Sequence, residues 1–167
     1  GGSARLLDGG REAFPAMLAA IRAARAAVFL EFYMFSPEGI GAAFIAALSA
    51  AARRGVRVEV VIDAWGSAPG TSEVVASLAA AGCEVRAWGS FLGILPGRLR
   101  RNHRKILAVD GEVAFVGGLN IADEYGLYLV DEANVESHGM GYPPATTLGN
   151  RPAWRDSHLA RTIRMVE

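Results

Sequence analysis

The chain has 167 residues, of which 51% are hydrophobic, and its 17 basic residues balance 17 acidic ones. A chain of this length can bury one ordinary hydrophobic core, so we expect a single domain over residues 1–167. The zero net charge argues against a protein that binds bulk polyanions, and no run of about 18 apolar residues predicts a membrane-spanning helix.

Helical and extended patterns alternate along the first half of the chain. Apolar residues at helical spacing predict an amphipathic helix over residues 14–25, and an apolar run predicts a strand over residues 28–35. Ser36-Pro37-Glu38 predict the start of a second helix, because they combine a capping hydroxyl, a first-turn proline and an early carboxylate. The pattern then predicts the end of that helix at Gly55, a strand over 56–62, a helix from Thr71 to Gly82 and a strand over 83–88.

A hairpin opens the second half. Residues 106–109 and 113–116 read as two strands around the turn Asp110-Gly111, and a last strand is predicted over residues 157–166. The order strand–helix–strand–helix–strand favours a parallel sheet with right-handed crossovers, to which the hairpin adds further strands. We therefore expect an α/β fold with a mostly parallel mixed sheet flanked by helices.

Two long loops interrupt this pattern. The first, residues 89–102, holds an apolar stretch at 91–95 and is followed by basic residues at Arg98, Arg100, Arg101, Arg104 and Lys105. Such a run is either a solvated basic loop or a surface for an anionic, partly apolar ligand, and basic residues near an anionic membrane gain about 1 kcal/mol each. The second loop, residues 126–152, is of a size that is usually functional or disordered, and its role does not follow from the sequence.

The residues around the hairpin combine groups that can hold and attack a phosphate. His103 and Lys105 are two residues apart, so in an extended chain their side chains project on the same side. Lys105 is the only lysine in the chain, and its compact ammonium differs from the rigid guanidinium fork used elsewhere. Gly117 and Gly118 let the backbone approach a ligand closely, and Asn120 adds an amide beside them. Glu31 and Asp63, near the carboxyl ends of predicted strands, are weaker candidates.

The pattern H-x-K-x4-D-x6-G-G-x-N, which runs from His103 to Asn120, resembles the signature of the phospholipase D superfamily. Gly118 stands where serine is more common, and this departure resembles the cardiolipin synthase-like branch. The stretches Asn102–Lys105, Gly118–Tyr125 and Trp154–His158 also agree with that branch, so the resemblance covers nearly the whole chain.

The resemblance implies a phosphatidyltransferase of phospholipid biosynthesis, which moves a phosphatidyl group between alcohols through a phosphohistidine. His103 would be one of two histidines, of which one attacks phosphorus and the other protonates the leaving alcohol and then activates the acceptor. Lys105 and Asn120 would hold the non-bridging oxygens and stabilise the charge that builds in the transition state. Gly117, Gly118 and the arginines of the first loop would contact the substrate. The family's reaction requires no metal and no cofactor.

Two aspartates receive different roles. Asp156, in the stretch that resembles the family, is the expected carboxylate that orients His103, with Glu124 or a plain surface acid as alternatives. Asp110 belongs to the motif but lies in the predicted turn next to Gly111, so we expect a structural role for it.

The chain contains one H-x-K pattern, although the implied mechanism needs two histidines at the phosphate. We therefore expect half of an active site, as the N-terminal half of a longer two-motif polypeptide or as one subunit of a symmetric homodimer. The implied partners are an anionic glycerophospholipid, the surface of the bacterial cytoplasmic membrane, and the second half. The alternatives are a homodimeric phosphodiesterase or nuclease of the same superfamily, which the neutral net charge disfavours, and a catalytically silent lipid- or phosphate-binding domain.

Overall fold

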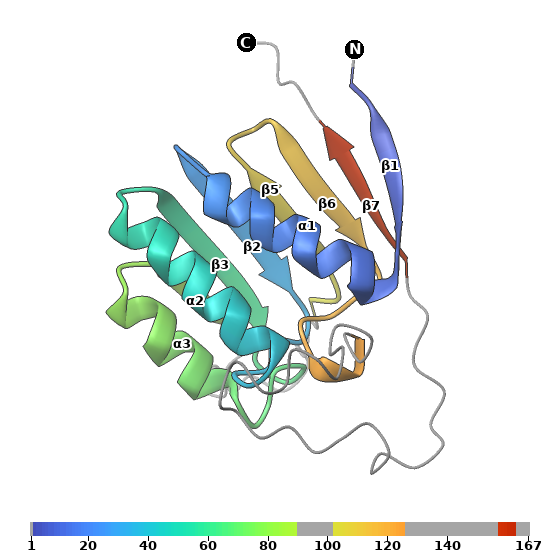
Figure 1. Ribbon diagram of the computed structural model, residues 1–167. Helices are drawn as coiled ribbons and strands as arrows, with labels where there is room; N and C mark the ends of the chain where they lie inside the picture. Colours follow the sequence, from blue (N-terminus) through green and yellow to red (C-terminus); the bar gives the residue numbers. More distant parts are fainter. Residues whose placement is uncertain (1, 90–101, 126–156, 163–167) are drawn as a thin grey trace, which may run out of the picture.

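The computed structural model describes residues 2–89, 102–125 and 157–162, the last of these by its backbone alone. In this part of the chain, seven strands form one sheet in the order β1-β7-β6-β5-β2-β3-β4, and three helices lie together on one face of it (Figure 1). The elements in chain order are β1 (Ala4–Asp8), α1 (Gly9–Ala23), β2 (Ala27–Phe32), α2 (Ile40–Arg53), β3 (Arg57–Asp63), α3 (Thr71–Ala80), β4 (Glu84–Trp88), β5 (Lys105–Val109), β6 (Val113–Gly117), a 3₁₀ turn η1 (Asp123–Tyr125) and β7 (Ser157–Thr162).

The sheet is mixed, as the sequence predicts, but four of its six strand pairings are antiparallel, so it is not mostly parallel. Strands β2, β3 and β4 run parallel, whereas β5 pairs antiparallel with β2 and places Lys105 opposite Phe32. The predicted hairpin is confirmed: β6 returns along β5 through Asp110 and Gly111, whose φ angles of 54° and 67° are the positive values that a tight two-residue hairpin turn uses. β7 then lies between β6 and β1 and is antiparallel to both.

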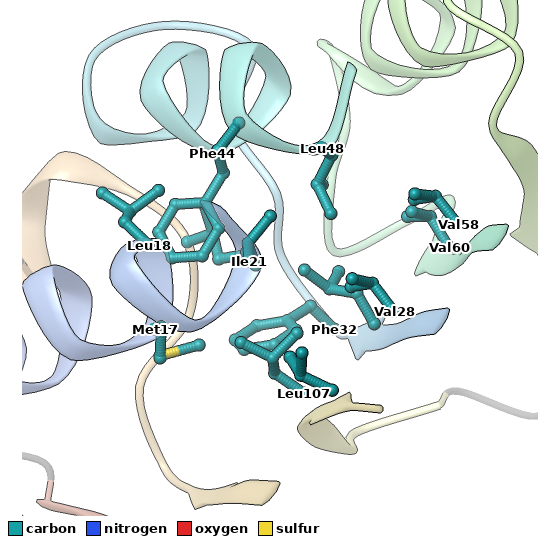
Figure 2. Packing of buried hydrophobic residues seen from close by; sticks show 14 of the residues in the cluster. Met17, Leu18, Ile21, Val28, Phe32, Phe44, Leu48, Val58, Val60 and Leu107 are labelled. Carbon is teal, nitrogen blue, oxygen red and sulfur yellow. The ribbon is translucent and has the colours of Figure 1, made fainter. Parts of the chain in front are cut away.

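The core lies between the sheet and the helices. Alternate residues of β2 point toward α1 and α2, and Val28, Leu30 and Phe32 are at most 2% exposed. Figure 2 shows side chains of α1 and α2, with Phe44 and Leu48 among them, packed over Phe32 and Leu107. Because burying each large apolar side chain stabilises a fold by about 1.5–3 kcal/mol, this layer fixes β2 and β5 relative to each other.

Several boundaries differ from the sequence prediction: the first helix runs from Gly9 to Ala23 and not over residues 14–25. The first predicted strand ends at Phe32, and α2 begins at Ile40 because Gly39 takes a positive φ of 58°. The Ser36 hydroxyl accepts the Glu38 N–H at 3.3 Å and does not cap the helix; instead the Ile40 N–H donates to the distant Asp123 carboxylate at 2.7 Å. Residues 163–166 of the predicted last strand lie outside the described residues, and strand β1 was not predicted.

No helix in the described segments is long and apolar enough to span a membrane.

Candidate active site

The carboxyl ends of β2 and β3 meet the beginning of β5 at one end of the sheet. Phe32, the last residue of β2, lies opposite Lys105, the first residue of β5, and β3 ends alongside at Asp63. Open α/β sheets place ligands beyond the carboxyl ends of their parallel strands. The segment that carries His103 lies at this end of the sheet, directly before β5.

His103 and Lys105 are in contact, and Tyr33 lies against both. The Lys105 Nζ is 3.3 Å from His103 Nδ1 and donates to the His103 carbonyl at 3.2 Å. The ring centroids of Tyr33 and His103 are 4.6 Å apart, and the ammonium lies 5.4 Å from the centre of the Tyr33 ring, within the range of a cation–π contact. Lys105 is only 4% exposed, whereas His103 faces solvent. A nearly buried positive charge therefore lies in contact with a solvent-accessible imidazole.

The contact between Lys105 and His103 selects one tautomer of a neutral imidazole ring. An ammonium carries only donors, so the Nδ1 atom that faces it must act as the acceptor, and Nε2 then carries the proton.

Asn120 is held next to the strand end that carries Tyr33. Its Oδ1 accepts the Met34 N–H at 3.3 Å, and its Nδ2 donates to the Tyr125 hydroxyl at 2.8 Å. The backbone of Ile121 also pairs with Met34, through an N–H···O bond of 3.1 Å. Asn120 is 4% exposed, and the Tyr125 bond accounts for one of its two amide hydrogens.

Asp110 holds the connection between α1 and β2. One carboxylate oxygen accepts the N–H of Arg25 at 2.8 Å, and the other accepts those of Ala26 and Ala27 at 2.9 and 2.8 Å. Desolvation acts to raise the pKa of Asp110, but these three N–H donors and the charge of Arg25 together lower it below its ordinary value. The contacts support the structural role that the turn position predicts.

The family model described as "Cardiolipin synthase, PLD-like domain" matches residues 17–140, which include the second half of α1, all elements from β2 to η1 and every site residue described above. The chain belongs to this family. A second model, the TIM barrel domain of glycosyl hydrolases family 2, matches residues 117–167. That range is a minor part of the chain. Its one strand described over its full length, β7, pairs antiparallel with both neighbours, whereas the strands of a TIM barrel run parallel.

Curated relatives and solved structures agree with this family assignment. Cardiolipin synthase B of Escherichia coli K12 is 38% identical over 128 residues, which are 75% of this chain and 31% of that protein. Cardiolipin synthase A of Pseudomonas fluorescens is 35% identical over 167 residues, 96% of this chain and 30% of that protein. The chain thus spans less than a third of the length of these relatives.

Two solved structures share the fold of this PLD-like domain. Nuc, a phospholipase D family member from Salmonella typhimurium, has a TM-score of 0.65 and 18% identity over 99% of this chain and 85% of its own. NucT from Helicobacter pylori also has a TM-score of 0.65, with 15% identity over 97% of this chain and 86% of its own. At these identities the likeness concerns the fold.

Within the PLD-like domain, the residues predicted from the sequence are brought together in part. His103 contacts Lys105, and Tyr33 lies against both. Asn120 is hydrogen-bonded to Met34, the residue after Tyr33. Gly117 ends β6, and Gly118 leads from it to the buried pair Leu119 and Asn120. Their roles toward a substrate stay predictions. The remaining predicted residues, Arg98, Arg100, Arg101 and Asp156, and the loop 126–152 lie outside the described residues.

Glu124, the alternative orienting carboxylate, is exposed in η1. It lines an open hollow of about 280 Å³ together with Met34, Ser67 and Asp123. In the described part of the chain, Glu124 makes no hydrogen bond or ion pair with His103, so the geometry gives this alternative no support.

Sequence reasoning missed three side chains that shape this site, namely Tyr33, Asn102 and Tyr125. The only signal for Tyr33 is its position directly after a buried strand. Asn102 belongs to the stretch that resembles the family, but its neighbours, Glu31 and Asp63, come from other strands. These partnerships depend on the pairing of β2, β3 and β5 and are not encoded in a local pattern.

Proposed function

We propose that this domain supplies one half of the active site of a phosphatidyltransferase similar to the bacterial cardiolipin synthases. The observation that carries the proposal is the contact between the accessible His103 and the nearly buried Lys105, with Asn120 held nearby, in a domain of this family. The substrate is an anionic glycerophospholipid at the surface of the bacterial cytoplasmic membrane, and the products are an alcohol and a new phosphodiester.

In the proposed reaction, His103 Nε2 attacks phosphorus and forms a phosphohistidine as the bond to the first alcohol breaks. A second histidine donates a proton to that alcohol and then takes one from the acceptor alcohol, which attacks the phosphohistidine and restores the ring. The phosphate oxygens draw the Lys105 ammonium away from Nδ1, so Nδ1 can carry the proton that Nε2 attack requires. Asp156 is the proposed acceptor of the hydrogen bond from that Nδ1–H.

The second histidine is proposed to come from another motif-bearing half. This chain has a single H-x-K pattern, and it spans less than a third of the length of the curated cardiolipin synthases that it matches. The half belongs to a longer polypeptide or to a second copy related by a two-fold axis. The molecular mass in solution, measured together with the full open reading frame, distinguishes these arrangements.

The covalent step is tested by replacing His103. His103→Ala is expected to lower transfer by several orders of magnitude, since removing one member of such a constellation has that effect. Rapid quenching of the wild-type protein, in the full open reading frame that encodes the chain, is expected to trap acid-labile phosphate on His103. Label on a serine, or transfer that survives the substitution, would refute the nucleophile assignment.

A homodimeric phosphodiesterase is the second candidate. It is favoured by the similar fold and similar length of Nuc and NucT, of which this chain covers 85% and 86%. Hydrolysis of a phosphodiester without an acceptor alcohol, by a dimer of this chain, would support this candidate over transfer.

A further inference from the structure

Asn102, the residue before His103, is tied to two neighbouring strands. Its backbone N–H donates to Asp63 Oδ2 at the end of β3, at 2.9 Å, and its side-chain amide donates to the Glu31 carboxylate in β2. Its Oδ1 accepts the Arg104 N–H at 3.4 Å, on the far side of His103. The backbone that carries the imidazole is therefore held through Asn102 on both of its flanks.

The Asp63 end of this connection is rigid. Asp63 is 1% exposed, and its other oxygen accepts the N–H groups of Trp65 and Gly66 at 3.0 and 2.9 Å. A buried carboxylate that accepts three backbone donors is a fixed point, because losing any of these bonds leaves a charge in apolar surroundings. Gly66 packs directly on the Tyr33 backbone, where a Cβ would overlap the Tyr33 carbonyl. The end of β3 thus supports both Asn102 and the ring neighbour of His103.

The Glu31 end is polar and partly accessible. Glu31 lies opposite Ile106, one pair before the end of the β2–β5 pairing at Phe32 and Lys105, with its side chain 26% exposed. Its carboxylate accepts the Asn102 amide and lies 3.6 Å from the Arg104 guanidinium. Because this carboxylate faces a residue on each side of His103, it links the two flanks of the same short segment.

We propose that Asn102 is a positioning residue for His103, with Glu31 and Asp63 as its two anchors. The inference rests on the proposed function, in which the imidazole must reach phosphorus at about 3–3.5 Å, and a misplacement of about 1 Å lowers the rate roughly 100-fold. His103 faces solvent, and its ring lies against Tyr33 and Lys105. The flanking backbone therefore sets where the ring begins its approach to the phosphate.

The test uses the full open reading frame that encodes the chain and reverses the polarity of one hydrogen bond. Asn102→Asp places two carboxylates against each other, and the double variant E31Q/N102D restores the pair with the amide and the carboxylate exchanged. We expect Asn102→Ala and Asn102→Asp to lower kcat roughly 10- to 100-fold with little change in KM, and E31Q/N102D to recover most of that loss. A residue that only supported the fold would change the melting temperature without this recovery.

The matched control is Glu59→Gln. Glu59 in β3 lies opposite Phe29, so it points to the same side of the sheet as Glu31, but it pairs with Arg57 and has no contact with the His103 segment in the described structure. We expect Glu59→Gln to leave kcat unchanged. Unchanged kcat in Asn102→Ala, or no recovery in E31Q/N102D, would overturn the positioning role while the nucleophile assignment stands.

A second readout does not depend on activity. The His103 ring signals in a carbon–proton NMR spectrum of the same full-length protein can be assigned by their loss in His103→Ala. We expect Asn102→Ala to broaden or split these signals and E31Q/N102D to return them to a single set. If the protein forms no phosphohistidine, the proposed function fails, and these spectra still decide the role of Asn102: signals that Asn102→Ala leaves unaltered would refute it.

Discussion

Replacing Asp110 by asparagine separates the structural role of this aspartate from the chemistry of the motif in which it lies. The carboxylate holds Arg25 N–H with one oxygen and Ala26 and Ala27 N–H with the other. Asparagine has nearly the same shape and tolerates the left-handed conformation, here with φ 54°. The substitution therefore removes the charge and sets an NH₂ group against one backbone donor, without straining the turn.

The expected loss follows from these contacts. A hydrogen bond to a charged group contributes about 1.5–3 kcal/mol when it is sheltered, and solvent near this half-exposed turn reduces that value. We therefore expect Asp110→Asn to lower the free energy of unfolding by about 1–2 kcal/mol, or the melting temperature by about 2–8 °C for a chain of this size. Circular dichroism melts at pH 7 measure this loss, and Glu112→Gln, an exposed acid in the same turn, is the control with an expected change below about 0.5 kcal/mol.

The pH dependence provides a sharper check. The pKa of Asp110 is lower in the folded state than its ordinary value, so its stabilisation is fully present above about pH 4–5 and is lost as the pH falls through the lowered value. The difference in melting temperature between wild type and Asp110→Asn should be constant from pH 7 to about pH 5 and shrink on further acidification. A difference that persists in acid, or an Asp110→Asn protein that melts normally but has no activity, would refute the structural role.

Two further predictions concern residues outside the described segments. Asp156→Asn is expected to abolish phosphohistidine formation while leaving the melting temperature unchanged, because it removes the proposed partner of the His103 imidazole; retained activity would move that role to another acid. Replacing Arg98, Arg100 and Arg101 together by glutamate is expected to lower affinity for anionic liposomes by at least about 3 kcal/mol, and high salt should have a similar effect on the wild type. Tighter binding of the wild type to single-stranded DNA than to liposomes at physiological salt would instead favour a nuclease.

Most of the sheet could be predicted because most of its strands carry their own signal. The buried strands β2 and β3 are largely apolar, interrupted by Glu31 and Glu59, and the β5–β6 hairpin has a turn sequence that fits its positive φ angles. Strand β1 has no such signal, since Leu7 is buried but Leu6 is 66% exposed, and the strand is defined by its pairing with β7. The start of α2 was placed too early because its capping carboxylate, Asp123, lies far along the chain.

The candidate site was likewise predictable only where a local sequence pattern determines a contact. The contact of His103 with Lys105 follows from the two-residue period of an extended chain, which a sequence displays directly. The packing of Tyr33 on His103 and the bond from Asn102 to Glu31 follow from the antiparallel register of β2 against β5. That register joins segments that lie far apart in the sequence, so the contacts across it cannot be assigned from a local pattern.

The place of β7 between β6 and β1 has a consequence for the order of folding. Among the described strands, β1 pairs only with β7, and Figure 1 shows the two strands side by side at one edge although they lie far apart in the sequence. During synthesis β2 to β6 can assemble first, while the edge of β6 stays open as a template for another strand. Pairing of such distant segments is slow because a long loop must close. Of the seven described strands, β1 is thus the first to be synthesised and the last that can enter the sheet.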